Sequence, residues 1–175
     1  TSTWAMKKKA NGTYRARIDA RGFEQVEGKH YDKTQISAPV VNEITVRIVL
    51  TLICMAQWFV MLLDVKGAFL CGNFENNEEI YMKVPQGFER FFSENAVLLL
   101  LKTIHGLKQA ALAFWRELLK AFKNMQYGRS KADPCLYFKW TALGLILWLS
   151  WVDDCLVAGK EEGVLTAKAS MMELF

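Results

Sequence analysis

Apolar and polar side chains alternate most strictly over residues 14–21. Such alternation predicts a β-strand in which Arg15, Arg17 and Arg21 share one face. The Asn11-Gly12 pair before this segment is the strongest short hairpin signal, so we expect a β-hairpin near the start of the chain. The basic face has two interpretations of equal weight: a solvated edge strand, or guanidiniums that bind phosphates.

Apolar residues recur at helical spacing in two longer segments. A helix over residues 42–58 has Asn42 as its N-cap, and its many apolar residues predict that it is buried almost all round. A second helix is predicted over residues 107–125, with Gly128 at the position of a C-cap glycine. Lys108 lies in the first turn of this second helix. It either holds an anion there or is an ordinary solvated lysine.

Aspartates end one apolar run of the sequence and interrupt another. The run 59–63 predicts a strand that ends on Asp64, and the run 145–159 is interrupted by Asp153 and Asp154. We interpret the second run as two buried strands with both acids at the turn between them. Adjacent anions beside a core are costly unless a cation offsets their repulsion, and Mg²⁺ is the usual cation. The alternative, which this turn alone favours, is a plain Asp-Asp surface turn.

The predicted elements follow in the order hairpin, helix, strand, hairpin, strand, helix, hairpin and helix. This order indicates an α+β fold in which helices pack on one face of an antiparallel sheet. The chain has 175 residues, of which 52% are hydrophobic and 23% charged, as is typical of a single globular domain over 1–175. It begins and stops in mid-pattern, so we expect it to be a fragment of a longer protein.

Charge, cysteine content and the length of the apolar runs limit the classes of partner, cofactor and cellular location that we expect. The net charge of +4 permits a nucleic-acid partner without demanding one. The four cysteines form no Cys-x-x-Cys pair and have no nearby histidine, which argues against zinc and indicates reduced thiols of an intracellular protein. The longest apolar run, around residues 143–152, is too short to span a bilayer and ends on two acids. A polar segment, and not an apolar one, follows Lys7 to Lys9, so we expect no signal peptide at the start of the chain.

One arrangement would unite the acidic residues. If the strand 59–64 pairs beside the hairpin 145–159, then Asp64, Asp153 and Asp154 converge on one end of the sheet. Three carboxylates on a sheet, with basic groups upstream and a lysine at a helix start, fit two-metal phosphoryl chemistry.

Seven motifs then occur in a familiar order along nearly the whole chain. They are YRARIDARGF (14–23), SAPV (37–40), LDVKGAFL (63–70), EIYM (79–82), PQGF (85–88), GLKQA (106–110) and WVDD (151–154). With these motifs the sequence closely resembles the reverse transcriptase of copia-type (Pseudoviridae-like) retrotransposons. The resemblance implies a fingers-and-palm fold without a thumb. Fingers would cover roughly 1–58 and 75–105, and palm roughly 59–74 and 106–175.

The resemblance also implies RNA-directed DNA polymerase activity with two Mg²⁺ ions, or Mn²⁺ in their place. The implied catalytic residues are Asp64, Asp153 and Asp154, and the same three acids with Val65 would hold the metals. Implied contacts to the nucleotide or template come from Arg15, Arg21, Phe69, His105, Gly106 and Lys108, and Trp151 would contact the primer. The bulk of Phe69 would exclude a ribose 2′-hydroxyl, and Gly106 would let the nucleotide or template approach the backbone closely.

The implied partners are an RNA template, a DNA or tRNA primer, deoxynucleoside triphosphates, and the rest of a Pol polyprotein with its thumb, ribonuclease H and integrase. The implied location is intracellular, in cytoplasmic virus-like particles or the nucleus, without a membrane. Three departures from the family pattern stand out: Trp151 and His105 replace tyrosines, and Ala111-Leu112 replaces Pro-Arg. They keep two alternatives open, a catalytically inactive remnant that retains the fold and a module that only binds nucleic acid.

Overall fold

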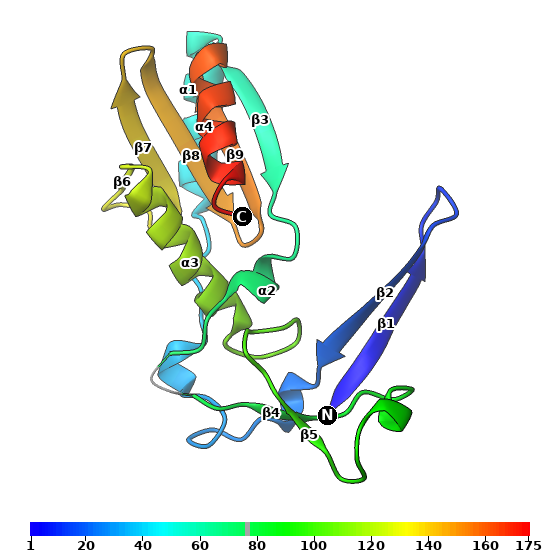
Figure 1. Cartoon of the computed structure of the whole chain (residues 1–175). Coiled ribbons are helices and arrows are strands. Elements are labelled where there is room, and N and C mark those ends of the chain that lie inside the picture. The colour runs from blue at the N-terminus through cyan, green and yellow to red at the C-terminus, as the bar shows by residue number, and fades with distance from the viewer. Residues whose placement is uncertain (76–77) are drawn as a thin grey trace. The chain divides into compact units, whose positions relative to one another are not determined.

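The computed structural model describes residues 1–75 and 78–175, and these form two compact units (Figure 1). The first unit comprises residues 1–37 and 69–114, and the second comprises 38–68 and 115–175. In this division the helix that precedes Asp64 belongs to the second unit. The predicted limits of fingers and palm stay a prediction, because compactness alone does not assign a functional subdomain.

The first unit opens with the predicted β-hairpin. Strands β1 (Ser2–Lys8) and β2 (Tyr14–Ala20) pair antiparallel, with Lys8 opposite Tyr14 beside the turn. Gly12 takes the left-handed conformation (φ 82°) that this turn requires. The hairpin signal in the sequence is therefore confirmed.

A short sheet and four short helical segments complete the first unit. They are η1 (Gly22–Glu24), η2 (Lys33–Gln35), α2 (Ala68–Cys71, shared with the second unit), β4 (Tyr81–Lys83), η3 (Glu89–Phe91) and β5 (Val97–Leu99). Strands β4 and β5 pair antiparallel. The core beside them is built from Ala20, Ile80, Leu107 and Ala110, against which Phe69 packs.

The second unit contains a five-stranded antiparallel sheet in the order β3-β9-β8-β7-β6. Its strands are β3 (Phe59–Asp64), β6 (Gly128–Arg129), β7 (Leu136–Thr141), β8 (Gly144–Trp151) and β9 (Asp154–Gly159). Because β3 pairs with β9, the strand predicted at 59–64 does lie beside the hairpin predicted at 145–159.

Helices cover both faces of this sheet, so the prediction that they lie on one face is wrong. The helices are α1 (Glu43–Ala56), α3 (Ala110–Asn124, which begins in the first unit) and α4 (Glu161–Met172). Val49 of α1 packs in a cluster with Leu147. On the opposite face Phe122 of α3 stacks on Tyr137, with ring centroids 3.9 Å apart, and α4 packs against β3, β8 and β9. Strand β8 is buried on both faces, and each face therefore needs a cover.

The helix ends and the burial of α1 also differ from expectation. Asn42 caps α1 as predicted, since its Oδ1 accepts a hydrogen bond from the Ile44 N–H at 2.8 Å. However, α1 is not buried all round, because Ile44 and Met55 are 67% and 78% exposed. Helix α3 is followed by Gln126 in the left-handed conformation (φ 64°), whereas Gly128 lies in β6. Within residues 1–75 and 78–175 no helix is long and apolar enough to cross a membrane.

Candidate active site

The acidic residues meet at one end of the five-stranded sheet. Asp64, the last residue of β3, is the register partner of Asp154, the first residue of β9. Directly opposed residues of antiparallel strands project from the same face. The main chain continues the pairing by one step, since the Val65 N–H donates to the Asp153 carbonyl oxygen at 3.0 Å. The predicted convergence of the three acidic positions is therefore present in the backbone.

The turn between β8 and β9 is strained. Only Val152 and Asp153 connect the paired residues Trp151 and Asp154, so the loop has two residues. Val152 has φ 54°, a left-handed conformation that is rare for a β-branched residue and costs about 1–3 kcal/mol. Hairpin turns with a positive φ at their first loop residue normally have glycine there. The pairing of Trp151 with Asp154 places Asp153 at the tip of the hairpin.

The donor atoms fit a hard divalent cation, but the side chains are not gathered into a cage. Carboxylate and main-chain oxygens are the ligands that Mg²⁺ prefers, and Asp64 and Asp154 are exposed to solvent. Among the described residues, no three His, Cys, Asp or Glu side chains lie close enough to hold a metal ion. The expected cage of three carboxylates is thus not formed by the side chains as they stand.

The surroundings of the acids are apolar on one side and aromatic on the other. Burial, and after it the negative charges of Asp154 and Asp153, raise the pKa of the Cys155 thiol to about 12. Trp151 is paired with Asp154 in the register, shares its face, and is 58% exposed. An exposed aromatic surface therefore lies beside the acids, as the role predicted for Trp151 requires.

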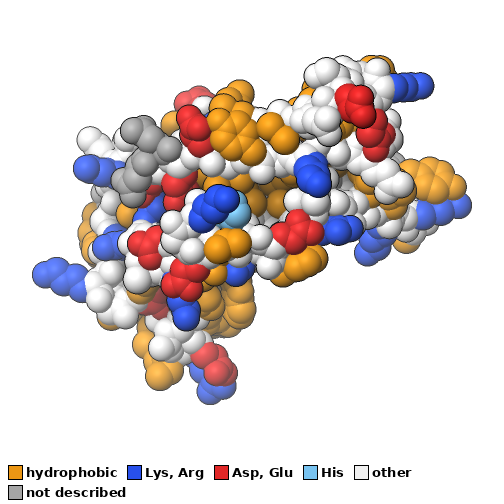
Figure 2. Space-filling model, turned by 90° about the horizontal axis from the view of Figure 1, so that it is seen from below, with side chains coloured by type: hydrophobic (Ala, Val, Ile, Leu, Met, Phe, Trp, Pro, Cys, Tyr) orange, Lys and Arg blue, Asp and Glu red, His pale blue; other side chains and the backbone are white. Residues whose placement is uncertain are grey.

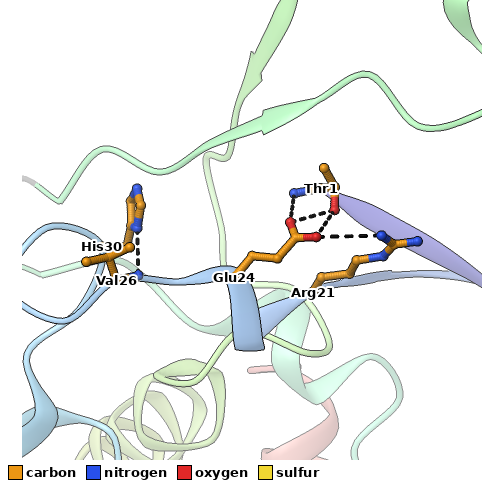
Figure 3. A network of polar contacts seen from close by, with 5 residues as sticks. All are labelled: Thr1, Arg21, Glu24, Val26 and His30. Atoms are coloured by element: carbon orange, nitrogen blue, oxygen red, sulfur yellow. Dashed lines mark hydrogen bonds and ion pairs between the residues drawn. The ribbon is translucent and has the colours of Figure 1, made fainter.

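The basic candidates belong to the first unit, and two of the three arginines are engaged there. Arg17 donates two hydrogen bonds to Asp19, at 2.6 and 3.1 Å, and this partner raises the pKa of Arg17. Arg21 forms an ion pair with Glu24 at 3.6 Å (Figure 3). Arg15 has no carboxylate partner among the described residues, and the residue opposite it on β1 is Lys7.

Charges elsewhere on the surface are mixed in sign. On the face shown in Figure 2, basic and acidic side chains are interspersed with apolar ones. With a net charge of only +4, phosphate binding has to depend on individually placed cations rather than on a large basic field. Of the predicted basic candidates, Arg15 and Lys108 have no carboxylate partner among residues 1–75 and 78–175, whereas Arg21 is paired with Glu24.

The segment before α3 holds the remaining candidates. Lys108 precedes the helix, which begins at Ala110, so the prediction that Lys108 lies in its first turn is wrong. The Lys108 ammonium donates to the Tyr31 hydroxyl at 2.8 Å and lies 4.3 Å from the centre of the Tyr31 ring. The His105 ring meets the Phe69 ring edge-on, with centroids 4.7 Å apart.

The local structure by itself requires a glycine at position 106. Its φ is 89°, and a Cβ at this position would overlap the Ala20 carbonyl oxygen. The Ala20 N–H also donates to the His105 carbonyl oxygen at 2.7 Å, which ties the end of β2 to this loop. The glycine is therefore needed for packing within the first unit, and its approach to a nucleotide stays a prediction.

Comparison with known proteins decides the family. A family model described as reverse transcriptase (RNA-dependent DNA polymerase) matches residues 1–175. The chain belongs to the reverse transcriptase family. The Retrovirus-related Pol polyprotein from transposon TNT 1-94 of Nicotiana tabacum is 38% identical over 168 residues, which cover 93% of this chain and 12% of that protein. The corresponding polyprotein from transposon RE1 of Arabidopsis thaliana is 32% identical and covers 93% of this chain and 11% of its own length.

These relatives confirm the resemblance to copia-type Pol polyproteins. A more distant relative, the truncated transposon Ty1-A Gag-Pol polyprotein of Saccharomyces cerevisiae, is 28% identical over 91% of this chain and 12% of its own length. The chain thus spans about an eighth of the length of the TNT 1-94 polyprotein. What it shares with them is the reverse transcriptase region.

The structure shows where two of the departures from the family pattern lie in this chain. Leu112, which stands where the family has arginine, is buried in α3 at 8% exposure. His105 keeps an aromatic ring against Phe69 where the family has tyrosine. Both replacements are accommodated by local packing within the first unit.

Sequence reasoning missed two residues of this chain that the structure singles out. Tyr31 holds the Lys108 side chain, and Gln25 accepts a hydrogen bond from the Lys108 N–H at 2.8 Å. Both lie in a polar segment of irregular backbone, where neither periodicity nor spacing indicates a long-range partner. Their separation from Lys108 by about 80 positions left no local signal.

Proposed function

We propose that this chain contributes the fingers and palm of an RNA-directed DNA polymerase, which transfers nucleotides to a primer 3′-hydroxyl. The observation that carries the proposal is the pairing of Asp64 with Asp154 beside Asp153 in a chain of the reverse transcriptase family. The first unit would act as fingers and the sheet of the second unit as palm. The remainder of a Pol polyprotein would supply the other parts of the enzyme.

The acidic end of the sheet would bind divalent metal. Asp64, Asp153 and the main-chain carbonyl of Val65 would hold Mg²⁺, with Asp154 supporting them from the same face as Asp64. Mg²⁺ bound there would lower the pKa of the primer 3′-hydroxyl and neutralise charge on the triphosphate. The strained turn at Val152 would keep Asp153 at a fixed place on the hairpin, and Trp151 would offer its ring to the primer end.

The first unit would bind and select the nucleotide. Arg15 and Lys108 would donate to phosphate oxygens, which Arg suits by its forked donors and Lys by its compact charge. Arg21 would do so less readily because Glu24 already engages it. Phe69 would select deoxynucleotides by leaving no space for a 2′-hydroxyl, and its ring is backed by His105. The substrates would be an RNA template, a DNA or tRNA primer and deoxynucleoside triphosphates, within intracellular virus-like particles.

Primer extension tests the proposal. The 175-residue chain, and a Pol polyprotein that contains it, would be assayed on an RNA template with Mg²⁺ and deoxynucleotides. We expect extension that Asp153→Asn reduces by roughly 10³-fold, about 4 kcal/mol of transition-state stabilisation. Asp32→Asn is the matched control, because Asp32 is an exposed turn aspartate of the first unit and should leave extension unchanged.

Two other outcomes would contradict the proposal. A chain that folds and binds primer–template but never extends it, with or without Asp153, would be a silent remnant. A chain whose salt-dependent binding is its only activity would be a binding module.

A further inference from the structure

Lys108 is held by an aromatic side chain rather than by an acid. Its ammonium donates to the Tyr31 hydroxyl at 2.8 Å and lies over the Tyr31 ring at 4.3 Å. No carboxylate lies within ion-pair distance of it in the described parts of the chain. Lys108 is therefore fixed in position while its positive charge stays unneutralised.

The loop that carries Tyr31 is ordered by its own hydrogen bonds. The Gly28 N–H donates to the Tyr31 carbonyl oxygen and the His30 N–H to the Val26 carbonyl oxygen, both at 2.9 Å. The Val26 N–H in turn donates to His30 Nδ1 at 2.9 Å, which folds the imidazole back over the loop (Figure 3). The backbone around Tyr31 is thus ordered without any contribution from the Lys108 side chain.

Two glutamines fasten this loop to the segment that carries Lys108. The Gln25 side chain accepts from the Lys108 N–H at 2.8 Å and donates to Gln109 Oε1 at 2.9 Å. Gln109, which is 6% exposed, donates to the His30 carbonyl oxygen at 3.1 Å. The base of the Lys108 side chain and its tip are therefore fixed relative to the same loop.

A tyrosine partner suits a lysine that must bind an anion. The ring attracts the cation without cancelling its charge, and the hydroxyl occupies one of the three ammonium N–H groups, so two can still donate. A free lysine loses much rotamer freedom when it binds, and prior ordering removes part of that cost. A carboxylate in place of Tyr31 would order the lysine equally well but would compete with the anion.

We propose that Tyr31 is a positioning residue that holds the Lys108 ammonium ready for a phosphate group. This inference rests on the phosphate-binding role of Lys108 in the proposed function. The phosphate belongs either to the incoming nucleotide or to the nucleic acid, and the two sources are separated below by measuring each ligand directly.

The contact itself is tested by lysine acylation of the 175-residue chain, followed residue by residue by mass spectrometry. We expect Lys108 to react several-fold faster in Tyr31→Leu and to a smaller extent in Tyr31→Phe, which keeps the ring. Tyr14→Leu is the matched control, since Tyr14 is an exposed tyrosine that contacts Lys8 instead. Equal Lys108 reactivity in all four chains would overturn the positioning role.

The functional consequence is tested by affinity, with a labelled RNA–DNA primer–template and a fluorescent deoxynucleoside triphosphate as separate probes. We expect Tyr31→Leu to weaken one of the two about five- to tenfold and Tyr31→Phe about twofold. In a Lys108→Met background the Tyr31 substitutions should have no further effect, because coupled residues are not additive.

The outcomes separate the two proposals. If Lys108→Met weakens a probe while Tyr31→Leu does not, the positioning role is wrong and the phosphate role stands. If Lys108→Met weakens neither probe, the phosphate role of Lys108 fails, and the positioning role fails with it. Additive losses in the double variant would show that Tyr31 acts on the fold and not through Lys108.

Discussion

Asp64 and Asp154 are register partners at the ends of β3 and β9, and their carboxylates share one face of the sheet. The backbone alone enforces this proximity, because β3 pairs with β9 through six consecutive residue pairs that end on these two acids. The repulsion between the two anions is therefore built into the fold, and a divalent cation would relieve it.

The first prediction concerns metal-linked stability. Mg²⁺ should raise the free energy of unfolding of the 175-residue chain by about 1.4 kcal/mol at a concentration tenfold above its Kd. Asp64→Asn should abolish most of that gain, because it removes one of the opposed carboxylates. Thermal unfolding with and without Mg²⁺ measures both effects. An equal gain in Asp64→Asn and in the unchanged chain would show that the ion binds elsewhere.

The second prediction concerns the strained turn. Val152→Gly should raise the free energy of unfolding by about 1 kcal/mol, because glycine relieves the positive φ at a cost of only 0.5–1 kcal/mol in chain entropy. Ala142→Gly, in the neighbouring β7–β8 loop and without a positive φ, is the matched control and should lower stability. Urea unfolding of the two variants checks the difference. A loss of stability in both would mean that the turn at Val152 is not strained.

The third prediction concerns choice of sugar. In a polymerase that contains this chain, Phe69→Ala should raise the use of ribonucleotides relative to deoxynucleotides at least about tenfold, the scale on which pocket shape discriminates. Phe69 also packs against the first unit's core, so the alanine variant should lose stability too. The ratio of kcat/KM for the two sugars in one preparation is independent of the folded fraction. An unchanged ratio would remove Phe69 from sugar selection.

Local signals predicted those parts of the fold that depend on neighbouring residues. Asn11-Gly12 predicted the first hairpin, Asn42 predicted the start of α1, and the apolar runs around the acids predicted β3, β8 and β9. The hypothesis that the strand 59–64 pairs beside the hairpin 145–159 then brought the acids together, and the register confirms that pairing in the backbone. The nucleotide and metal roles of these residues remain predictions.

Features that depend on distant partners could not be predicted. Periodicity showed that α1 is apolar, but it could not show that Ile44 and Met55 face solvent. The glycine rule for helix ends favoured Gly128, whereas Gln126 takes the left-handed conformation. The hydrogen bond from the Lys108 ammonium to the Tyr31 hydroxyl joins two residues that are 77 positions apart in the chain. The placement of helices on both faces of the sheet likewise depends on tertiary packing, which a local sequence pattern does not determine.

The last prediction concerns Asp133, which ties the start of α1 to β7. It is 2% exposed, and its carboxylate accepts from the Asn42 and Cys135 N–H groups, each at 2.9 Å. Burial by itself would raise the pKa of Asp133, but hydrogen bonds from Thr45, Asn42 and Cys135 together outweigh it and lower the pKa. The ionised form is therefore the one that the fold stabilises.

Replacement of this carboxylate should weaken the second unit at neutral pH. Asp133→Asn presents an amide NH₂ to an N–H donor and should lower the free energy of unfolding by about 2–3 kcal/mol. Because the folded pKa is lowered, the contribution of Asp133 is present above its unfolded pKa of about 3.9 and is lost as pH falls through the folded value. Urea unfolding between pH 7 and 3 should show the two chains converging in stability at the acid end. Asp32→Asn, an exposed aspartate whose turn makes similar bonds, should cost much less at neutral pH. A difference between Asp133→Asn and the unchanged chain that persists undiminished at low pH would mean that shape, and not charge, is what Asp133 contributes.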